Sequence, residues 1–361
     1  MVNSKFTRRV RTAFAASAGR VGAVPLLVFL VIAGCDLGDE VEGMPAPERT
    51  AEFGLVVHGG AGTITRESLT PELEEQYHSA LEEALRAGHD ILEQGGSALD
   101  AVSAAVVVLE DEPLFNAGRG AVFTAEGTNE LDAAIMDGRT LDAGAVGGVK
   151  RIRNPIELAR LVMDESPHVF MVGEGAETFG RQFDVVEVDE DYFYTEARWE
   201  ALQRALENDG TSSAPSSADD GRMLGTVGAA ALDRDGNLAA ATSTGGMTAK
   251  RFGRVGDVPV IGAGTYANNA SCALSATGHG EYFIRNVVSY DICARMLYTG
   301  ATLEEAADAV IHGVLVEQGG TGGVVAIDAS GNIALTMNTP GMYRGHMLAG
   351  QDPVTRIYQE E

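Results

Sequence analysis

The sequence predicts an α/β fold, a four-layer αββα sandwich in which helices cover the outer faces of two stacked sheets. An apolar strand opens the first half of the chain, and two helical patterns follow it. The second half carries two hairpins, at 226–243 and 323–337, with further helical patterns between them. Each half of the chain has strands at both of its ends and paired helices between them. This order predicts two stacked sheets whose outer faces are covered by the helices.

The composition is that of a globular, acidic protein. Of 361 residues, 45% are hydrophobic, which is enough for a buried core. The 52 acidic and 26 basic residues give a net charge of −26, which argues against nucleic acid as a partner because phosphates need clustered Lys and Arg. This acidity fits a saline habitat and equally an ordinary acidic protein. Three cysteines are too few for a disulfide framework or a zinc site, so Cys272 and Cys293 are expected to be buried thiols.

The first 35 residues, 1–35, are typical of a targeting segment. A basic start precedes an apolar run, 21–34, that is short for a membrane span. The run ends in Ile32-Ala33-Gly34-Cys35, which resembles a bacterial lipobox. It predicts an exported lipoprotein that lipid on Cys35 holds to the cell membrane, on its periplasmic or outer face. A secretory signal peptide that is cut elsewhere is the alternative, and residues 36–52 are expected to be a tether.

The folded part is expected to begin with an apolar strand, 53–57, that leads into the glycine-rich run 58–62. Such a run can bind phosphate, but no Lys follows it and the GxGxxG spacing is absent, so nucleotide binding is poorly supported. A helix with Thr70 as its N-cap comes next and ends at Gly95. Ser97 then caps a second, more apolar helix that is expected to be buried.

A polar segment, 207–225, divides the folded region into two parts of one domain, 53–206 and 226–361. No large apolar residue occurs between Glu207 and Gly221, so we expect a flexible linker. The pattern returns abruptly after it. The expected elements are hairpin strands at 226–232 and 238–243, and at 323–327 and 333–337, with helices at 281–297 and 303–316 between the hairpins.

Thr226 stands where this linker meets the first strand, which is how a proteolytic activation site should look. If the bond from Gly225 breaks, Thr226 becomes a new N-terminus. Its α-amino group, with a pKa near ~8, can then accept the proton of its own hydroxyl, so nucleophile and base lie in one residue. Taken alone, a threonine at a strand start is ordinary, because β-branched residues favour strands.

The residues around Thr226 carry a resemblance to a known family. The matching runs are Val57–Gly62, Pro113–Gly120, Gly225–Gly228, Thr242–Met247, Gly253–Asp257, Gly262–Asn269 and Ala276–Glu281. They resemble the plant-type L-asparaginase and isoaspartyl peptidase family, which consists of N-terminal-nucleophile hydrolases of the threonine type. The likeness runs from about Phe53 to Arg344. It implies the αββα fold of that class, self-cleavage at Gly225-Thr226 into α and β chains, a homodimer of αβ units, and hydrolysis of L-asparagine and β-aspartyl dipeptides.

The resemblance implies a role in the reaction for each matching residue. Thr226 would attack the side-chain carbonyl of the substrate, and Thr244 would orient its hydroxyl. Thr277 and the amide of Gly278 would form the oxyanion hole, where each fixed donor stabilises the transition state by ~3 kcal/mol.

It also implies the residues that bind the substrate. Arg254 would hold the α-carboxylate with a bidentate guanidinium, a geometry that lysine cannot copy. Asp257 would pair with the α-ammonium group, and Asn116 would lie near the same pocket, as would Gly278. Such a site reads a free amino-acid head and so selects aspartyl groups that are linked through their side chain.

No cofactor is expected beyond a structural sodium ion. The segment 109–119 resembles the sodium-binding loop of the family, which uses mainly backbone carbonyls. The residues that would supply them are Leu109, Glu110, Glu112, Phe115, Ala117 and Arg119. Two departures from the family pattern, Val258 after Asp257 and His279 between two glycines, bear on substrate preference.

Other functions are less well supported. An aspartylglucosaminidase-like hydrolase shares the fold but usually has Asn where Gly245 stands, and threonine-aspartase-like proteases rank below it. A membrane-tethered, non-catalytic binding module should lack one of the residues above, and all are present. A Ser-His-Asp hydrolase lacks its Gly-x-Ser-x-Gly elbow, and His58 and His279 lie in glycine-rich runs that are expected to be turns.

Overall fold

The computed structural model describes residues 49–209 and 225–361. The predicted targeting segment with its lipobox, most of the predicted tether and most of the predicted linker lie outside these residues. The end of the predicted tether belongs instead to the folded domain. The amide of Thr50 donates to the carbonyl of Ser330 at 2.7 Å, and Ala51 is buried.

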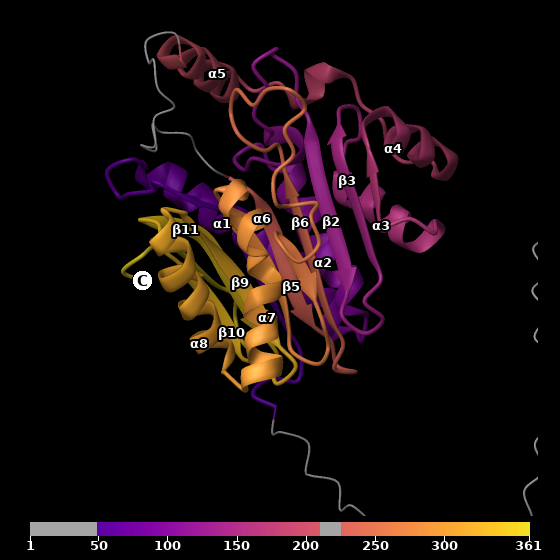
Figure 1. Ribbon diagram of the computed structural model, residues 1–361, viewed down its shortest axis with the longest axis vertical. Helices are drawn as coiled ribbons and strands as arrows, with labels where there is room; N and C mark the ends of the chain where they lie inside the picture. Colours follow the sequence, from indigo (N-terminus) through magenta and orange to yellow (C-terminus); the bar gives the residue numbers. More distant parts are fainter. Residues whose placement is uncertain (1–48, 210–224) are drawn as a thin grey trace, which may run out of the picture. The chain divides into compact units, whose positions relative to one another are not determined.

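Eight strands form the larger sheet, in the order β12-β11-β1-β5-β6-β2-β3-β4 (Figure 1). Neighbours are antiparallel except for the parallel pair β3 and β4. The central hairpin, β5 and β6, consists of small residues and confirms the prediction for this segment. The strands are β1 (Gly54–Gly62), β2 (Leu131–Asp137), β3 (Ala143–Val149), β4 (Phe170–Val172), β5 (Val227–Leu232), β6 (Leu238–Thr244), β11 (Gly341–Leu348) and β12 (Val354–Tyr358).

Four antiparallel strands form the smaller sheet, in the order β10-β9-β8-β7. β9 and β10 are the second predicted hairpin, which is therefore also confirmed. The strands are β7 (Thr265–Ala267), β8 (Cys272–Gly278), β9 (Gly322–Asp328) and β10 (Ile333–Met337). Pairing of β8 with β9 runs from Cys272 opposite Asp328 to Gly278 opposite Gly322, so Thr277 lies at one end of this sheet.

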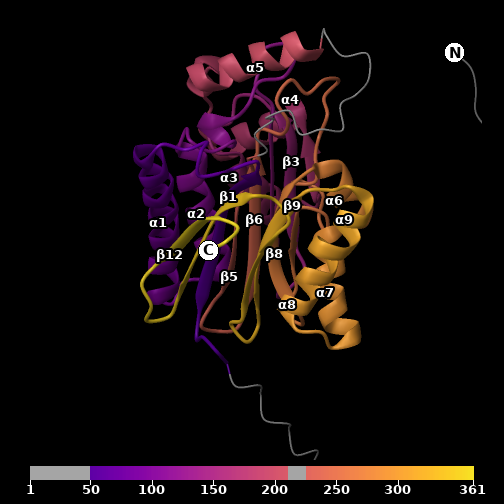
Figure 2. The ribbon, with the colours of Figure 1, turned by 90° about the vertical axis from the view of Figure 1, so that its left-hand side faces the viewer.

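The two sheets pack face to face, and helices cover their outer faces (Figure 2). α1, α2 and α3 pack on the larger sheet, and α7 and α8 pack on the smaller one. Separate apolar clusters fill the space under each helical layer and the space between the sheets. The predicted four-layer αββα sandwich is confirmed.

The helices of the first part begin where their capping residues predict. Thr70 accepts a hydrogen bond from the amide of Leu73 at the start of α1, and Ser97 accepts one from the amide of Asp100 in α2. α5 continues to Asp209, past the start of the predicted linker at 207. The helices are α1 (Pro71–Glu93), α2 (Ala98–Asp111), α3 (Pro155–Glu165), α4 (Gly173–Gly180) and α5 (Glu196–Asp209), with short 3₁₀ turns at Gly118–Gly120, Arg181–Phe183 and Glu190–Phe193.

Each of the two long helices predicted in the second part is divided. The first is α6 (Gly280–Asn286) and α7 (Val288–Thr299), separated at Val287, whose φ of 49° is left-handed and unusual for a β-branched residue. The second begins with the expected capping box, in which Thr302 and Glu305 each accept from the other's amide. It consists of α8 (Leu303–Asp308), a π-helical turn (Ala309–Val314) and α9 (Leu315–Gln318).

The expectation of free buried thiols at Cys272 and Cys293 is wrong, because the two form a disulfide. Cys272 opens β8 and Cys293 lies in α7, which covers that strand. The pair is 21 residues apart in sequence, and the packing of helix on strand brings their Cα atoms to 5.4 Å. That distance lies within the range that a disulfide can bridge.

Candidate active site

Thr226 lies directly before β5, near the centre of the larger sheet. β5 pairs with β1 on one side and with β6 on the other, so the start of β5 is held between two neighbouring strands. The structure is that of the continuous chain, in which Gly225 precedes Thr226. A Cβ on Gly225 would lie 3.0 Å from Cβ of Asn116, so position 225 has little room for a side chain.

The hydroxyl of Thr226 donates to the hydroxyl of Thr244, at 3.1 Å. Thr244 ends β6 and is also the acceptor for the amide of Gly246, at 3.0 Å. Since its oxygen accepts twice, its own proton is free to point elsewhere, and the carbonyl of Gly225 lies 3.5 Å away. The second threonine thus contacts both partners of the predicted cleavage, the attacking hydroxyl and the carbonyl that it would attack.

Thr277 and Gly278 come from the other sheet. Thr277 is buried near the end of β8, and its hydroxyl accepts the amide of Ala61 in β1, at 3.3 Å. Gly278 has a φ of +156°, and a Cβ there would lie 2.7 Å from both the Gly322 Cα and the Phe283 ring, which explains why glycine stands in this place. The face-to-face packing of β8 against β1 and β5 brings these residues to the Thr226 side of the sandwich.

Arg254 and Asp257 meet at Gly280, the first residue of α6. A Cβ on Gly280 would lie 2.7 Å from Nη2 of Arg254 and 2.8 Å from Oδ1 of Asp257. Nε and Nη2 of Arg254 donate to the two carboxylate oxygens of Glu281, at 2.9 and 3.0 Å. This ion pair uses one edge of the guanidinium, so Nη1 is left for another acceptor, and Gly256 leaves room for it.

Sequence reasoning missed Glu281, although it closes one of the quoted motifs. Burial raises the pKa of Glu281, but hydrogen bonds and charge from Arg254 outweigh that effect and lower it below its usual value. The carboxylate therefore stays ionised and fixes the guanidinium. The signal in the sequence was the charged residue that ends the motif Ala276–Glu281.

Asp257 is buried with an incomplete set of partners. Its Oδ2 has no hydrogen-bond partner within the described part of the chain, and burial raises its pKa to about 7. Arg254 acts in the opposite direction by favouring the charged form, and Glu281 adds to the rise. A buried carboxylate of this kind is poised to accept a cationic group that would restore its ionisation.

Asn116 braces the turn that follows β6. Its side-chain nitrogen donates to the carbonyl of Gly246 at 2.8 Å, and its side-chain oxygen accepts from the backbone amide of Val122 at 3.0 Å. Its backbone carbonyl accepts from the backbone amide of Gly245. A Cβ on Gly245 would lie 2.5 Å from Oδ1 of Asn116 and 2.8 Å from Cβ of Ala121. An asparagine at position 245 would therefore displace this turn.

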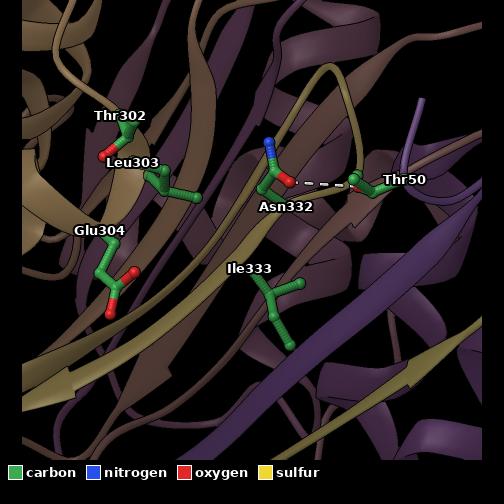
Figure 3. Close-up of a pocket in the computed structure, with 7 residues that line it drawn as sticks. Thr50, Thr302, Leu303, Glu304, Asn332 and Ile333 are labelled. Atoms are coloured by element: carbon green, nitrogen blue, oxygen red, sulfur yellow. Dashed lines mark hydrogen bonds between the residues drawn. The ribbon is translucent and has the colours of Figure 1, made fainter. Parts of the chain in front are cut away.

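Two hollows differ in their relation to these residues. A cavity of about 20 Å³ lies beside the predicted cleavage bond, lined in part by Gly225, Asn116 and Tyr343. It has room for a water molecule but not for an amino acid. A larger hollow, of about 460 Å³, is lined by Thr50, α8 and the β9-β10 turn (Figure 3). That turn follows Asp328, which pairs with Cys272, whereas Thr277 pairs with Gly323 near the other end of β9, so the larger hollow lies away from the site.

The segment 109–119 consists of the end of α2, a connecting loop and the start of the 3₁₀ turn at Gly118–Gly120, and some of its carbonyls face glycines. Gly118 has a φ of +47°, and a Cβ there would collide with the carbonyl of Glu110. A Cβ on Gly120 would likewise collide with the carbonyl of Phe115. Arg198 donates to the carbonyl of Gly120, just after the segment, at 2.8 Å and to that of Leu114 at 3.0 Å, and neither residue is a predicted ligand. Backbone carbonyls are the kind of oxygen ligand that a hard cation takes.

Known proteins share this chain's sequence over most of its length. The profile of the asparaginase family matches residues 51–357. An isoaspartyl peptidase of Escherichia coli is 53% identical over 311 residues, which cover 85% of this chain and 96% of the relative. An isoaspartyl peptidase of Salmonella typhimurium is 52% identical over 313 residues, 85% and 98% of the two chains. A human isoaspartyl peptidase/L-asparaginase is 43% identical over 282 residues, 77% and 87% of the two chains.

A sandwich of two sheets with a threonine at the head of a central strand defines the class of N-terminal-nucleophile hydrolases. The extent of the profile match and the identities decide the family within that class. The chain belongs to the asparaginase family.

Proposed function

We propose that this chain cuts its own Gly225-Thr226 bond and then hydrolyses L-asparagine and β-aspartyl dipeptides. The observation that carries the proposal is the contact of Thr244 with both the hydroxyl of Thr226 and the carbonyl of Gly225. The names of the relatives support the substrate class, since they are isoaspartyl peptidases or isoaspartyl peptidase/L-asparaginases.

Thr226 would be nucleophile and base in turn. Its freed amine takes the proton of its hydroxyl, and the oxygen attacks the side-chain carbonyl of the substrate. The attack gives a tetrahedral intermediate, and the hydroxyl of Thr277 and the backbone amide of Gly278 stabilise the negative charge on its oxygen. The proton passes to the departing nitrogen, which leaves as ammonia or as the amine of the second residue. Water then hydrolyses the aspartyl ester and regenerates Thr226.

The substrate would be held by its amino-acid head. The free end of the Arg254 guanidinium binds the α-carboxylate while Glu281 holds the other edge. Asp257 pairs with the α-ammonium group, which lowers the raised pKa of its carboxyl. The steric conflict at position 245 disfavours the aspartylglucosaminidase-like alternative, in which Asn usually stands there.

The test is to incubate the purified protein with L-asparagine, β-aspartyl-leucine and α-aspartyl-leucine while the chain is followed on a denaturing gel. We expect two chains, the second beginning at Thr226, and hydrolysis of the first two compounds only. The α-linked dipeptide is the control, because its peptide bond is made by the α-carbonyl of the aspartyl residue. The proposed site places the side-chain carbonyl, not the α-carbonyl, at the nucleophile. Hydrolysis by a preparation in which N-terminal sequencing finds only intact chain would refute the proposal.

Two further features of the assembly belong to this proposal. The loop 109–119 holds a structural sodium ion through its backbone carbonyls, supported by the carbonyls that face Gly118 and Gly120. The active form is a homodimer of αβ units. Native mass spectrometry tests both, because it weighs the assembly together with bound sodium, and a monomer without sodium would exclude them.

Export with a lipid anchor on Cys35 is the proposed location. The disulfide supports export, since such bonds persist mainly in oxidising compartments. Among the described residues, no helix is long and apolar enough to span a membrane. The proposed attachment is through the lipobox-like Ile32–Cys35. We expect the wild type in the membrane fraction and Cys35→Ser in the soluble fraction after export. A wild type that is already soluble after export would exclude the anchor.

A further inference from the structure

His58 connects three strands beneath the candidate nucleophile. Its glycine-rich run was predicted to be a turn, but β1 continues through His58 to Gly62 with a bulge between His58 and Gly60, and the side chain of His58 is fully buried. Its Nδ1 lies 2.9 Å from the carbonyl of Thr226, before β5, and its Nε2 lies 2.8 Å from the hydroxyl of Ser275 in β8.

The partners of His58 determine its tautomer. A carbonyl oxygen carries no proton, so the bond to Thr226 requires that Nδ1 be the protonated nitrogen and the donor. Nε2 must then accept, and the hydroxyl of Ser275 must donate to it. Burial lowers the pKa of His58 to about 3, although its bond to Thr226 works against this, so the ring is neutral near pH 7.

The remaining hydroxyls continue the chain in one direction. Because Ser275 gives its proton to His58, it accepts from Thr242, at 2.7 Å, and Thr242 in turn accepts from Thr265, at 2.7 Å. The hydroxyl of Thr265 has one proton, so while it donates to Thr242 it cannot donate to the carbonyl of Val258, 3.1 Å away. Buried hydroxyls therefore continue from the carbonyl of Thr226 through His58 as far as Thr265 in β7.

Gly228 is the residue of β5 that makes room for this arrangement. It lies opposite His58 in the β1-β5 ladder. A Cβ at this position would collide with the hydroxyl of Ser275 and would lie 2.7 Å from Nε2 of His58. The glycine two residues after Thr226 is therefore explained by the space that the imidazole and Ser275 need.

We propose that His58 is a positioning residue for the nucleophile: its Nδ1-H holds the carbonyl of Thr226 in place once cleavage has made Thr226 a chain end. This inference rests on the proposed self-cleavage. A new terminus loses the covalent constraint on its amino side and tends to fray. The bond to His58 fixes the peptide group after Thr226, and with it the directions of the amine and the hydroxyl. The role of Ser275 is to keep the imidazole in the tautomer that can donate.

The test compares His58→Leu, His58→Asn and Ser275→Ala with the wild type in hydrolysis of L-asparagine. Leucine removes the donor, whereas the amide nitrogen of asparagine takes about the place of Nδ1 and restores it. His89→Leu is the matched control, because His89 is also buried, with neither ring nitrogen hydrogen-bonded among the described residues. Rates are divided by the amount of cleaved chain on a denaturing gel, so that slower processing is not counted as slower hydrolysis.

For His58→Leu we expect kcat to fall ~100-fold with KM changed less than ~3-fold, since small misplacement of a reacting group costs about that much. His58→Asn should recover at least ~10-fold of the loss, Ser275→Ala should show a smaller fall in kcat, and His89→Leu should keep the wild-type kcat. Nitrogen NMR of the wild-type imidazole should show a protonated Nδ1 from pH 5 to pH 9, roughly the range in which a neutral ring is expected.

Three results would overturn the inference: a wild-type kcat in His58→Leu, equal losses in the leucine and asparagine variants, or a protonated Nε2. Should His58→Leu fail to fold, two other results decide the question: the kcat of Ser275→Ala relative to the wild type, and the tautomer of His58 that NMR finds. Failure of the proposed function is distinct, because it would be seen in the wild type as an absence of asparagine hydrolysis, whatever the tautomer of His58.

Discussion

Replacing Thr226 by alanine is expected to leave the chain in one piece and to lower hydrolysis of L-asparagine by a factor on the order of 10⁴ or more. The variant lacks the oxygen that attacks the Gly225 carbonyl and later the substrate. Thr226→Ser keeps an oxygen nucleophile and should cleave slowly with partial activity. Gel analysis over time and an ammonia-release assay measure the two reactions separately.

The two reactions of Thr226 differ in their base. In the uncleaved chain its nitrogen is an amide and cannot accept a proton, so self-cleavage depends on neighbours such as Thr244 or on water, and should be slow. After cleavage the amine is available, so hydrolysis should be faster and should decline as pH falls below the pKa of that amine.

Thr302→Ala is the matched control for Thr226→Ala. Thr302 lies in the capping box of α8, so its loss should reduce stability by about 1 kcal/mol and leave cleavage and hydrolysis unchanged. If an uncleaved Thr226→Ala protein hydrolysed L-asparagine at the wild-type rate, the nucleophile would lie elsewhere in the chain.

Arg254→Lys is expected to lower kcat/KM for L-asparagine roughly a hundredfold, mainly through KM, while self-cleavage continues. A guanidinium can serve Glu281 with one edge and the substrate carboxylate with Nη1, whereas an ammonium group cannot match both carboxylates in this geometry. The loss of a hydrogen bond between charged groups corresponds to about 2–3 kcal/mol. Steady-state kinetics give kcat and KM, and the gel gives the extent of cleavage.

Arg285→Lys is the control for this variant. Arg285 lies in the same helix as Glu281, with its guanidinium carbon 5.5 Å from the centre of the Tyr282 ring, and takes no part in the proposed binding. Its replacement should leave the kinetics unchanged. Asparagine kinetics in Arg254→Lys equal to those of the wild type would show that another group binds the α-carboxylate.

Local patterns were sufficient for much of the fold. The hairpins, the helix starts at Thr70 and Ser97, and the capping box at Thr302 each depend on residues that are close in sequence. The break at Val287 was not visible, because the apolar spacing runs through it. The amides of Ser289 and Tyr290, just after the break, donate to the carbonyls of Ala263 and Gly262, which are distant in sequence. The disulfide was missed for a similar reason, since only the stacking of α7 on β8 brings Cys272 to Cys293.

The candidate site shows the same division. Arg254 and Asp257 could be named from one motif because they are close in sequence, but their meeting at Gly280 and the ion pair with Glu281 require the return of the chain through β8. His58 was assigned to a turn because glycines follow it. Its strand conformation and its two partners arise from β5 and β8, which lie more than half the length of the described chain away in sequence.

The order of strands in the larger sheet has a consequence for the cleaved molecule. Cutting at Gly225 would leave β1 to β4 in one chain and β5 to β12 in the other, yet three ladders, β11-β1, β1-β5 and β6-β2, would still join them. The two chains should therefore stay together. Unfolding would remain a first-order process, but refolding would become second-order, so dilution would favour the separated chains. After self-cleavage, the lifetime of the native state would therefore be set by the rate of unfolding and not by the equilibrium between folded and unfolded chains.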